Sequence, residues 1–244
     1  MDNRYYFEEA DKSGKIILIK NQEFQHLAKV RRAKIGDKIT AFCGDGKDYI
    51  LELTNIAKNY AECEILEEKI NECNKAEDIT IYIASIKSDA LDQALDSLTQ
   101  LNVKDIVIFN NEYANVKYSQ EKVLKMKNKF IQFSKQCERA DIPNLKIISF
   151  NDMIEELKQK DLNILAYENA KENFLSLELE KFKGKSISII IGGEGGFSET
   201  EIEKLNSLTK RVSLGKTILR APVAVAVATG CVKALLGEFE RNEG

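Results

Sequence analysis

The strongest constraint on the fold is a regular alternation of apolar, strand-like runs and helical stripes that begins at residue 79. Ile79–Ile86 is almost wholly apolar, and Leu91–Leu101 then places its leucines at helical spacing. Such alternation predicts a mostly parallel sheet with helices on its faces, and ligands usually bind beyond the carboxyl ends of its strands. Further strands are expected at Asp105–Phe109, Leu145–Phe150, Leu162–Tyr167, Ser186–Ile191 and Arg211–Leu214, and a long basic helix at Val123–Cys137.

The first 70 residues follow a different pattern, in which short apolar or alternating runs are separated by glycine turns. Five strands are expected, at Tyr5–Phe7, Ile16–Ile19, Lys38–Phe42, Tyr49–Ile56 and Ala61–Leu66. This spacing predicts a small β-barrel, which a helix over Gln22–Arg32 interrupts. The polar stretch Asn71–Asp78 separates the two patterns. We therefore expect a β domain over residues 1–72 and an α/β domain over residues 73–244.

Scarce residue types exclude several kinds of site. His26 is the only histidine, so a two-histidine metal site is impossible and a serine–histidine mechanism would need this one residue. The five cysteines are widely spaced and never form C-x-x-C, which favours reduced structural thiols over disulfides or a zinc site. No run approaches the roughly 18 apolar residues of a membrane span, and the N-terminus lacks the layout of a signal peptide. We expect a cytoplasmic protein without a metal.

The net charge of −3 hides an uneven distribution along the chain. Residues 20–38 carry six basic against two acidic groups, and residues 116–146 carry eight against three. A local face for nucleic acid is one interpretation of these segments. A solvated charged surface is the commoner explanation, so charge alone does not decide between them.

The most informative loop for chemistry is Ile187–Glu203, in which an apolar strand runs into four glycines around Glu194. Glycines let the backbone turn sharply and approach a ligand closely. Ser198-x-x-Glu201 then forms a capping box that starts a helix. The spacing fits neither a Walker loop nor G-x-G-x-x-G, and a carboxylate would repel phosphate. A neutral or cationic ligand is therefore favoured, and a tight turn without a ligand is the alternative.

A second loop lies within Val212–Lys233. Leu214-Gly215 ends a strand, and Lys216–Arg220 forms a connecting loop. Pro222 then fits the first turn of a terminal helix. The alternating Val223, Val225 and Val227 would suit a strand equally well. Periodicity cannot separate the two, but the apolar residues continue to Phe239, and this length favours a helix.

These two loops carry a resemblance to a known family. The order strand, GGEGGFSETEIE, strand, SLGKTILR and apolar helix resembles the bacterial small-subunit ribosomal RNA uracil-N3 methyltransferases of the SPOUT, or trefoil-knot, class. Arg4-Tyr5-Tyr6 and His26-Leu27-x-Lys29-Val30-x-Arg32 are similar to the opening of that family's PUA-like β-barrel. Gln136-Cys137-x-Arg139 with Pro143 is a third match. The matches span nearly the whole chain in the family's order.

The helix before the second strand has Ser97 and Gln100-Leu101-Asn102 where the family usually has Lys and Glu-Leu-Gly. Two loop segments also differ from the family's usual pattern. Gly193 stands where the first loop usually reads G-P-E-G-G, and Ala221–Ala224 reads APVA where the family usually has T-E-T-A. The second difference removes a carboxylate and two hydroxyls. It leaves open a catalytically weakened RNA-binding or ribosome-assembly protein, or a SPOUT enzyme with another RNA target.

The resemblance implies a fold, a cofactor and partners. The fold is a PUA-like β-barrel followed by a parallel α/β knot domain, and the cofactor is S-adenosyl-L-methionine, held largely by backbone groups. The partners are 16S ribosomal RNA of the small subunit and a second copy of the chain. The implied cofactor residues are Tyr167, Glu168, Ile191, Gly192, Gly193, Glu194, Gly195, Gly196, Leu214, Gly215, Ile218, Leu219 and Arg220.

The same resemblance suggests roles in catalysis and RNA binding. Arg220 and Arg139 are expected to stabilise negative charge on the uracil, and Glu194 to neutralise the sulfonium, act as a base or only stabilise its loop. The target base must be unstacked to be reached. RNA contacts are expected from Arg4, His26, Lys29, Arg31, Arg32, Gln136 and Arg139, with a structural role for His26 equally well supported.

Overall fold

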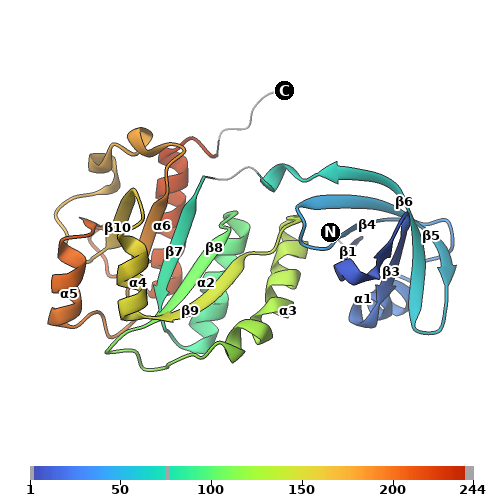
Figure 1. Cartoon of the computed structure of the whole chain (residues 1–244), viewed down its shortest axis with the longest axis horizontal. Helices are drawn as coiled ribbons and strands as arrows, with labels where there is room; N and C mark the ends of the chain where they lie inside the picture. Colours follow the sequence, from blue (N-terminus) through green and yellow to red (C-terminus); the bar gives the residue numbers. More distant parts are fainter. Residues whose placement is uncertain (1–2, 75–76, 240–244) are drawn as a thin grey trace. The chain divides into compact units, whose positions relative to one another are not determined.

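The computed structural model describes residues 3–74 and 77–239, which form two compact units (Figure 1). The N-terminal unit contains Met1–Lys75 and Ile131–Ile142, and the C-terminal unit contains Ala76–Phe130 and Pro143–Gly244. The first division lies three residues beyond the expected boundary. The larger difference is the segment 131–142, which belongs to the N-terminal unit although it was expected in the α/β domain.

The N-terminal unit is built on one six-stranded sheet in the order β1-β4-β5-β6-β3-β2. β1 pairs with β4 in parallel, and the other neighbours are antiparallel. All five expected strands are present, and a two-residue strand, β2, is added. The bounds are Arg4–Tyr6 for β1, Lys12–Ser13 for β2, Ile16–Lys20 for β3, Lys38–Phe42 for β4, Lys47–Ile56 for β5 and Tyr60–Ile70 for β6.

The helix expected at Gln22–Arg32 is shorter and less regular than its spacing predicts. It consists of α1 (Asn21–Gln25) and a wider π-helical turn, η2 (His26–Val30). Phe24 and Leu27 are buried in the core of the unit, so the apolar side of the pattern is as expected. Arg32 has a φ of +52°, a left-handed conformation that cannot continue a helix.

A buried hydrogen bond, flanked by two ion pairs, ties the segment 131–142 into the N-terminal unit. The guanidinium of Arg139 is only 1% exposed and lies 2.7 Å from the carboxylate of Asp141. Arg4 is 9% exposed, pairs with Asp48 at 2.6 Å, and donates a hydrogen bond to the backbone carbonyl of Arg139 at 2.7 Å. The two arginines therefore form part of the interior of this unit.

The buried pair of Arg139 and Asp141 predicts a stability defect. Arg139→Ala should lower the free energy of unfolding by about 3 kcal/mol, because it leaves a carboxylate in the interior without its cation. The exposed pair of Lys129 and Asp92 is the control, since Lys129→Ala should change the stability by less than about 1 kcal/mol. Urea denaturation measures both, and a wild-type midpoint for Arg139→Ala would contradict the structural role.

The C-terminal unit has a second six-stranded sheet, in the order β12-β10-β11-β7-β8-β9. Every neighbouring pair is parallel, as the alternation predicts. All carboxyl ends therefore lie at one edge. The bounds are Ile79–Ala84 for β7, Asp105–Asn110 for β8, Asn144–Ser149 for β9, Leu162–Ala166 for β10, Ile187–Ile191 for β11 and Lys210–Val212 for β12.

Helices cover both faces of this sheet (Figure 1). Apolar residues of α4 (Phe150–Leu157) and Leu205 of α5 (Glu199–Asn206) pack on Tyr82, Val107 and Ile190. The helices α2 (Ser88–Gln100) and α6 (Ala221–Leu235) pack against each other, and α6 also contacts strand β11. The remaining helices are α3 (Glu121–Gln136) and the short 3-10 turns η1 (Glu9–Asp11), η3 (Glu72–Asn74), η4 (Phe174–Leu177) and η5 (Leu179–Phe182).

The terminal segment is a helix, as its length favours over the strand-like alternation of its valines. Pro222 lies in the first turn of α6, where a missing backbone N–H leaves no hydrogen bond unmade. Among the described residues, no helix is both long and apolar enough to cross a bilayer.

Candidate functional site

Three loops at the carboxyl ends of neighbouring strands enclose a cavity of about 570 Å³. They follow β10, β11 and β12, which lie side by side at one end of the sheet. This is the edge at which parallel sheets bind ligands, and the volume is that of a small-molecule site. All thirteen residues predicted to hold a cofactor line the cavity, from Tyr167 and Glu168 through Ile191–Gly196 to Leu214, Gly215 and Ile218–Arg220.

The cavity has lining residues that the sequence analysis did not select. Five of the six are next to a predicted residue or lie one helical turn beyond it, and the sixth, Ile202, lies in the first turn of α5, so extending the loop motifs into the adjoining helices would have found them. They are Ala166, Phe197, Ile202, Thr217, Ala221 and Ala224.

The glycine loop is a tight turn fixed to the start of α5. The backbone N–H of Gly196 donates to the carbonyl of Gly193 at 3.0 Å, and Gly196 has a φ of +66°, which favours glycine. The expected capping box is present, since Ser198 and Glu201 exchange backbone-to-side-chain hydrogen bonds. The strand therefore turns into the helix within a few residues and leaves backbone groups facing the cavity.

Two glycines of this loop have no room for a side chain. A Cβ at Gly195 would lie 2.7 Å from the backbone carbonyl oxygen of Tyr113, and one at Gly192 would lie 3.0 Å from the ring of Phe197. At Gly193 the nearest atom would be 3.4 Å away, which is ordinary contact. Close backbone packing thus requires glycine at 195, whereas position 193 has space for a methyl group.

The loop after β12 supplies the opposite wall. Gly215 has a φ of +121°, and its N–H donates to the Ser213 hydroxyl at 3.2 Å. Arg220 is the N-cap residue of α6, is exposed, and forms no ion pair within the described ranges 3–74 and 77–239. A guanidinium at the cavity edge is therefore available to a ligand with negative charge.

Glu194 brings a negative charge to the same region. Its side chain is exposed at the cavity, and it lies close enough to Tyr118 to affect that phenol. The pKa of Tyr118 is raised mainly by burial, with Asp92 and then Glu194 adding to the effect. The site therefore combines backbone polar groups and aliphatic surface with two exposed carboxylates, Glu168 and Glu194, and one exposed guanidinium, Arg220.

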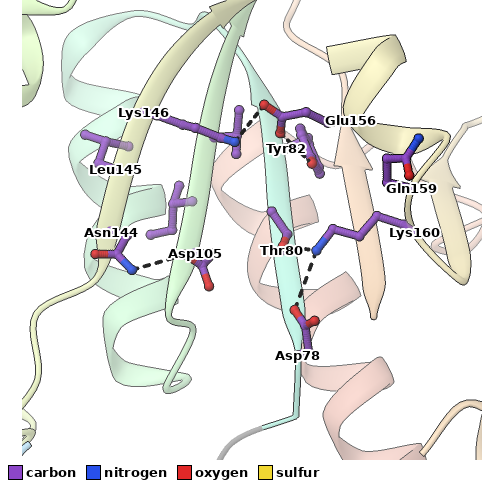
Figure 2. A pocket seen from close by; sticks show the side chains of 12 residues that line it. Asp78, Thr80, Tyr82, Asp105, Asn144, Leu145, Lys146, Glu156, Gln159 and Lys160 are labelled. Carbon is purple, nitrogen blue, oxygen red and sulfur yellow. Dashed lines mark hydrogen bonds and ion pairs between the residues drawn. The ribbon is translucent and has the colours of Figure 1, made fainter. Parts of the chain in front are cut away.

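A second cavity, of about 460 Å³, lies at the opposite ends of the strands (Figure 2). Its lysines already pair with carboxylates of the lining: Lys146 lies 2.6 Å from Glu156, and Lys160 lies 3.5 Å from Asp78. Burial and the hydrogen bond to Glu156 raise the pKa of Tyr82, which keeps this phenol neutral. The lining has no glycine turn and lies at the amino ends of β7–β9, so the glycine-lined cavity is the better candidate.

The residues predicted to bind RNA separate into exposed and buried groups. Lys29, Arg31, Arg32 and Gln136 are exposed. His26 is partly buried, with its ring centroid 5.8 Å from that of Tyr5, which leaves both of its expected roles open.

Arg4 and Arg139 do not occupy the positions that their expected roles need. Both are buried and ion-paired, and Arg139 is not part of the cavity lining. The geometry therefore favours structural roles for these two arginines instead of the expected contacts with uracil or phosphate. Their partners could not be recognised from the sequence. Asp48 is far from Arg4 along the chain, and Asp141, two residues after Arg139, belongs to no motif.

Comparison with known proteins agrees with this architecture. Residues 73–233 match a family described as RNA methyltransferase domain, and residues 19–66 match one described as RNA methyltransferase PUA domain. The chain belongs to the RNA methyltransferase family. The expected fold is thereby confirmed, with an N-terminal PUA-like β domain and a C-terminal parallel α/β domain of the SPOUT class.

Family members that cover nearly all of the chain strengthen the assignment. The ribosomal RNA small subunit methyltransferase E of Rickettsia conorii is 29% identical over 96% of both chains, and that of Bacillus subtilis is 28% identical over 88% of both. The solved structure of the Neisseria gonorrhoeae member, bound to S-adenosyl methionine, has a TM-score of 0.85 at 26% identity and covers 98% of this chain and 99% of its own. The resemblance to small-subunit ribosomal RNA methyltransferases is therefore confirmed.

The packing of the glycine loop in the present chain predicts different effects of alanine substitutions at Gly195 and Gly193. Gly195→Ala should lower the free energy of unfolding by about 1–3 kcal/mol, because the new methyl group would clash with backbone atoms at Tyr113. Gly193→Ala should change it by less than about 0.5 kcal/mol. Urea denaturation without ligand measures both, and equal midpoints would contradict the close packing of the two loops.

Proposed function

We propose that this chain is an S-adenosylmethionine-dependent methyltransferase that methylates N3 of a uridine in the 16S ribosomal RNA of the small subunit. Family membership supports RNA methylation, and the names of the full-length relatives support the small ribosomal subunit. The observation that carries the proposal is the glycine-lined cavity, because it collects every residue that the family resemblance assigns to the cofactor.

The residues of the cavity suit this cofactor. Gly192 and Gly195 let the loop pack closely against Phe197 and Tyr113. The four glycines of this loop line the cavity, so they offer a ligand backbone amide and carbonyl groups instead of side chains. Leu214, Ile218 and Leu219 supply aliphatic surface for a flat heterocycle. Glu194 supplies a negative charge for a sulfonium. When bound, S-adenosylmethionine supplies an electrophilic methyl group.

We assign charge stabilisation during methyl transfer to Arg220, and proton acceptance or cofactor orientation to Glu194. Loss of the N3 proton leaves negative charge on the ring, which the Arg220 guanidinium stabilises electrostatically at the edge of the cavity. Glu194 is suited to accept that proton or to orient the cationic end of the cofactor. Positioning by the three loops supplies the remaining lowering of the barrier.

The N-terminal unit is assigned to binding the RNA backbone. Lys29, Arg31 and Arg32 are exposed in and just after η2, and Gln136 is exposed at the end of α3. Contacts of lysine and arginine with phosphate give affinity and register without reading sequence. We propose that the protein acts on ribosomal RNA in the cytoplasm.

One feature favours a second candidate, an RNA-binding protein that does not transfer methyl groups. The start of α6 at the cavity is Ala221-Pro222-Val223-Ala224, and Ala221 and Ala224 line the cavity without a polar group. If the reaction needs an acid or base at that point, this chain does not provide it.

A homodimer is also proposed, on the basis of α6. Val223, Val227, Gly230 and Ala234 recur at helical spacing on one face, and Val223 is 49% exposed and Val227 37% exposed. An exposed apolar helix face is typical of an interface between subunits.

Methyl transfer can be tested with labelled S-adenosylmethionine and small subunits that lack the N3-methyluridine mark. We expect labelled N3-methyluridine after nuclease digestion and mass analysis. A different labelled nucleoside would indicate another RNA target. Cofactor binding without any label would favour the RNA-binding alternative, and no binding at millimolar cofactor would exclude both the enzyme and its cavity assignment.

The role of Arg220 predicts a kinetic separation. Arg220→Ala should lower kcat by about 10²-fold or more, because it removes charge stabilisation in the transition state, and should leave the Kd for S-adenosylmethionine within about threefold. Single-turnover kinetics and calorimetry measure the two quantities. Equal losses in both would assign Arg220 to cofactor binding alone.

The dimer predicts that a charge on the exposed face of α6 separates the subunits. Wild-type protein should have the mass of a dimer in light scattering, and Val227→Arg should shift it to a monomer, because a guanidinium would be buried without a partner. Leu124→Arg is the matched control, since Leu124 is 78% exposed on α3 and outside this face. A dimeric Val227→Arg variant would place the interface elsewhere.

A further inference from the structure

Residues 111–118, the segment that follows β8, pack directly on the glycine loop of the cavity. The backbone carbonyl oxygen and the Cβ of Tyr113 lie 2.7 Å and 3.0 Å from the position that a Cβ of Gly195 would occupy. Gly195 lines the cavity, whereas Tyr113 is not among the residues that line it. Tyr113 therefore packs against the glycine loop without lining the cavity itself.

Two hydrogen bonds join this segment to the glycine loop and to α5. Asn111, which is 3% exposed, donates from its side-chain amide to the carbonyl of Gly196 at 2.9 Å. The buried carboxylate of Glu201 accepts from the backbone N–H of Glu112 at 2.8 Å and from that of Ser198 at 3.0 Å. One carboxylate thus joins the start of α5, and with it the glycine loop, to the residue preceding Tyr113.

The far end of the segment is also fixed. Asn110 accepts from the backbone N–H of Tyr118 at 3.0 Å and from the Ser85 hydroxyl at 2.7 Å, and the Tyr118 hydroxyl donates to the carbonyl of Ile86 at 2.7 Å. The segment is therefore a braced loop across the carboxyl ends of β7, β8 and β11.

The side chain of Tyr113 is the exception in this braced loop, because it is 50% exposed. Its backbone and Cβ are held, yet the aromatic surface faces solvent next to Gly195 and Glu194. Holding a large planar side chain in a fixed place without burying it gives the fold little stability. Such a surface is suited to stack on an unpaired base, a contact that every base can make through its π-face.

We propose that Tyr113 is the stacking platform for the nucleobase that is methylated. This rests on the proposed RNA methyltransferase function and adds to it the residue that positions the target. A uracil taken out of its RNA stack loses its neighbours, and the ring of Tyr113 replaces one of them beside the glycine loop. Asn111 and Glu201 are positioning residues, since they act through the loop that carries Tyr113.

The position of Tyr113 predicts an effect on RNA and none on the cofactor. Tyr113→Ala should lower kcat/KM for RNA by about ten- to a hundredfold, the range for loss of one base–aromatic stack, and Tyr113→Phe should retain most of the wild-type value. Both variants should bind S-adenosylmethionine with the wild-type Kd and unfold at the wild-type temperature. Leu175→Ala, which removes another exposed apolar side chain outside the cavity, should change none of these quantities.

A second readout does not require methyl transfer. The chain contains no tryptophan, so Tyr113→Trp introduces a single indole at the proposed platform. A short single-stranded RNA with one uridine in an abasic background should quench its fluorescence, and the same RNA with that uridine also abasic should not. A Leu175→Trp variant should respond to neither RNA.

The two readouts distinguish failure of this proposal from failure of the proposed function. If wild-type protein does not methylate RNA but the uridine quenches Tyr113→Trp, the platform stands and the enzyme assignment falls. If wild-type protein methylates RNA and Tyr113→Ala has an unchanged kcat/KM, the platform is overturned. Equal quenching by both RNAs also overturns it.

Discussion

Parallel pairing of β10, β11 and β12 is the constraint on which the candidate site depends. Because each strand runs in the same direction, the loops that follow all three emerge at one edge and surround a single cavity. No loop encloses the cavity alone: the glycine loop supplies the backbone cradle, and the loop after β12 supplies the facing aliphatic wall and Arg220. A change of register in one strand would therefore remove one wall and leave the others in place.

Glu201 connects this sheet edge to the segment carrying Tyr113. Its carboxylate caps α5 in the usual local way and also accepts a hydrogen bond from Glu112, 89 residues earlier in the chain. A capping residue normally stabilises only its own helix. Here the same group sets the distance between the cofactor loop and the segment beside it, which explains why a carboxylate is 6% exposed at this position.

The sequence predicted the parts of the molecule whose signals are local. The strands of both units, the capping box at Ser198 and the three cavity loops depend on spacing within a few residues, and the structure has them where the pattern indicated. The roles expected for Arg4 and Arg139 did not follow in the same way. Their burial results from packing between segments 135 residues apart, and no spacing in the sequence reveals such a contact. The π-helical turn at His26–Val30 was missed for a related reason, since its apolar residues are nearly indistinguishable from those of an α-helix.

The difference between local signals and contacts between distant segments also separates the residues of the cavity loops from Tyr113. The residues proposed to hold the cofactor lie in continuous motifs because a ligand held by backbone groups needs consecutive residues of small size. Tyr113 lies in no motif, because a stacking surface needs only one aromatic ring at the correct place, and that place is set by hydrogen bonds from Asn111 and Glu201. In the proposed site the backbone groups of the glycine loop would fix where the methyl donor lies, whereas a single exposed ring can change without disturbing that loop. In a fold of this kind, the choice of RNA target can therefore vary independently of the choice of cofactor.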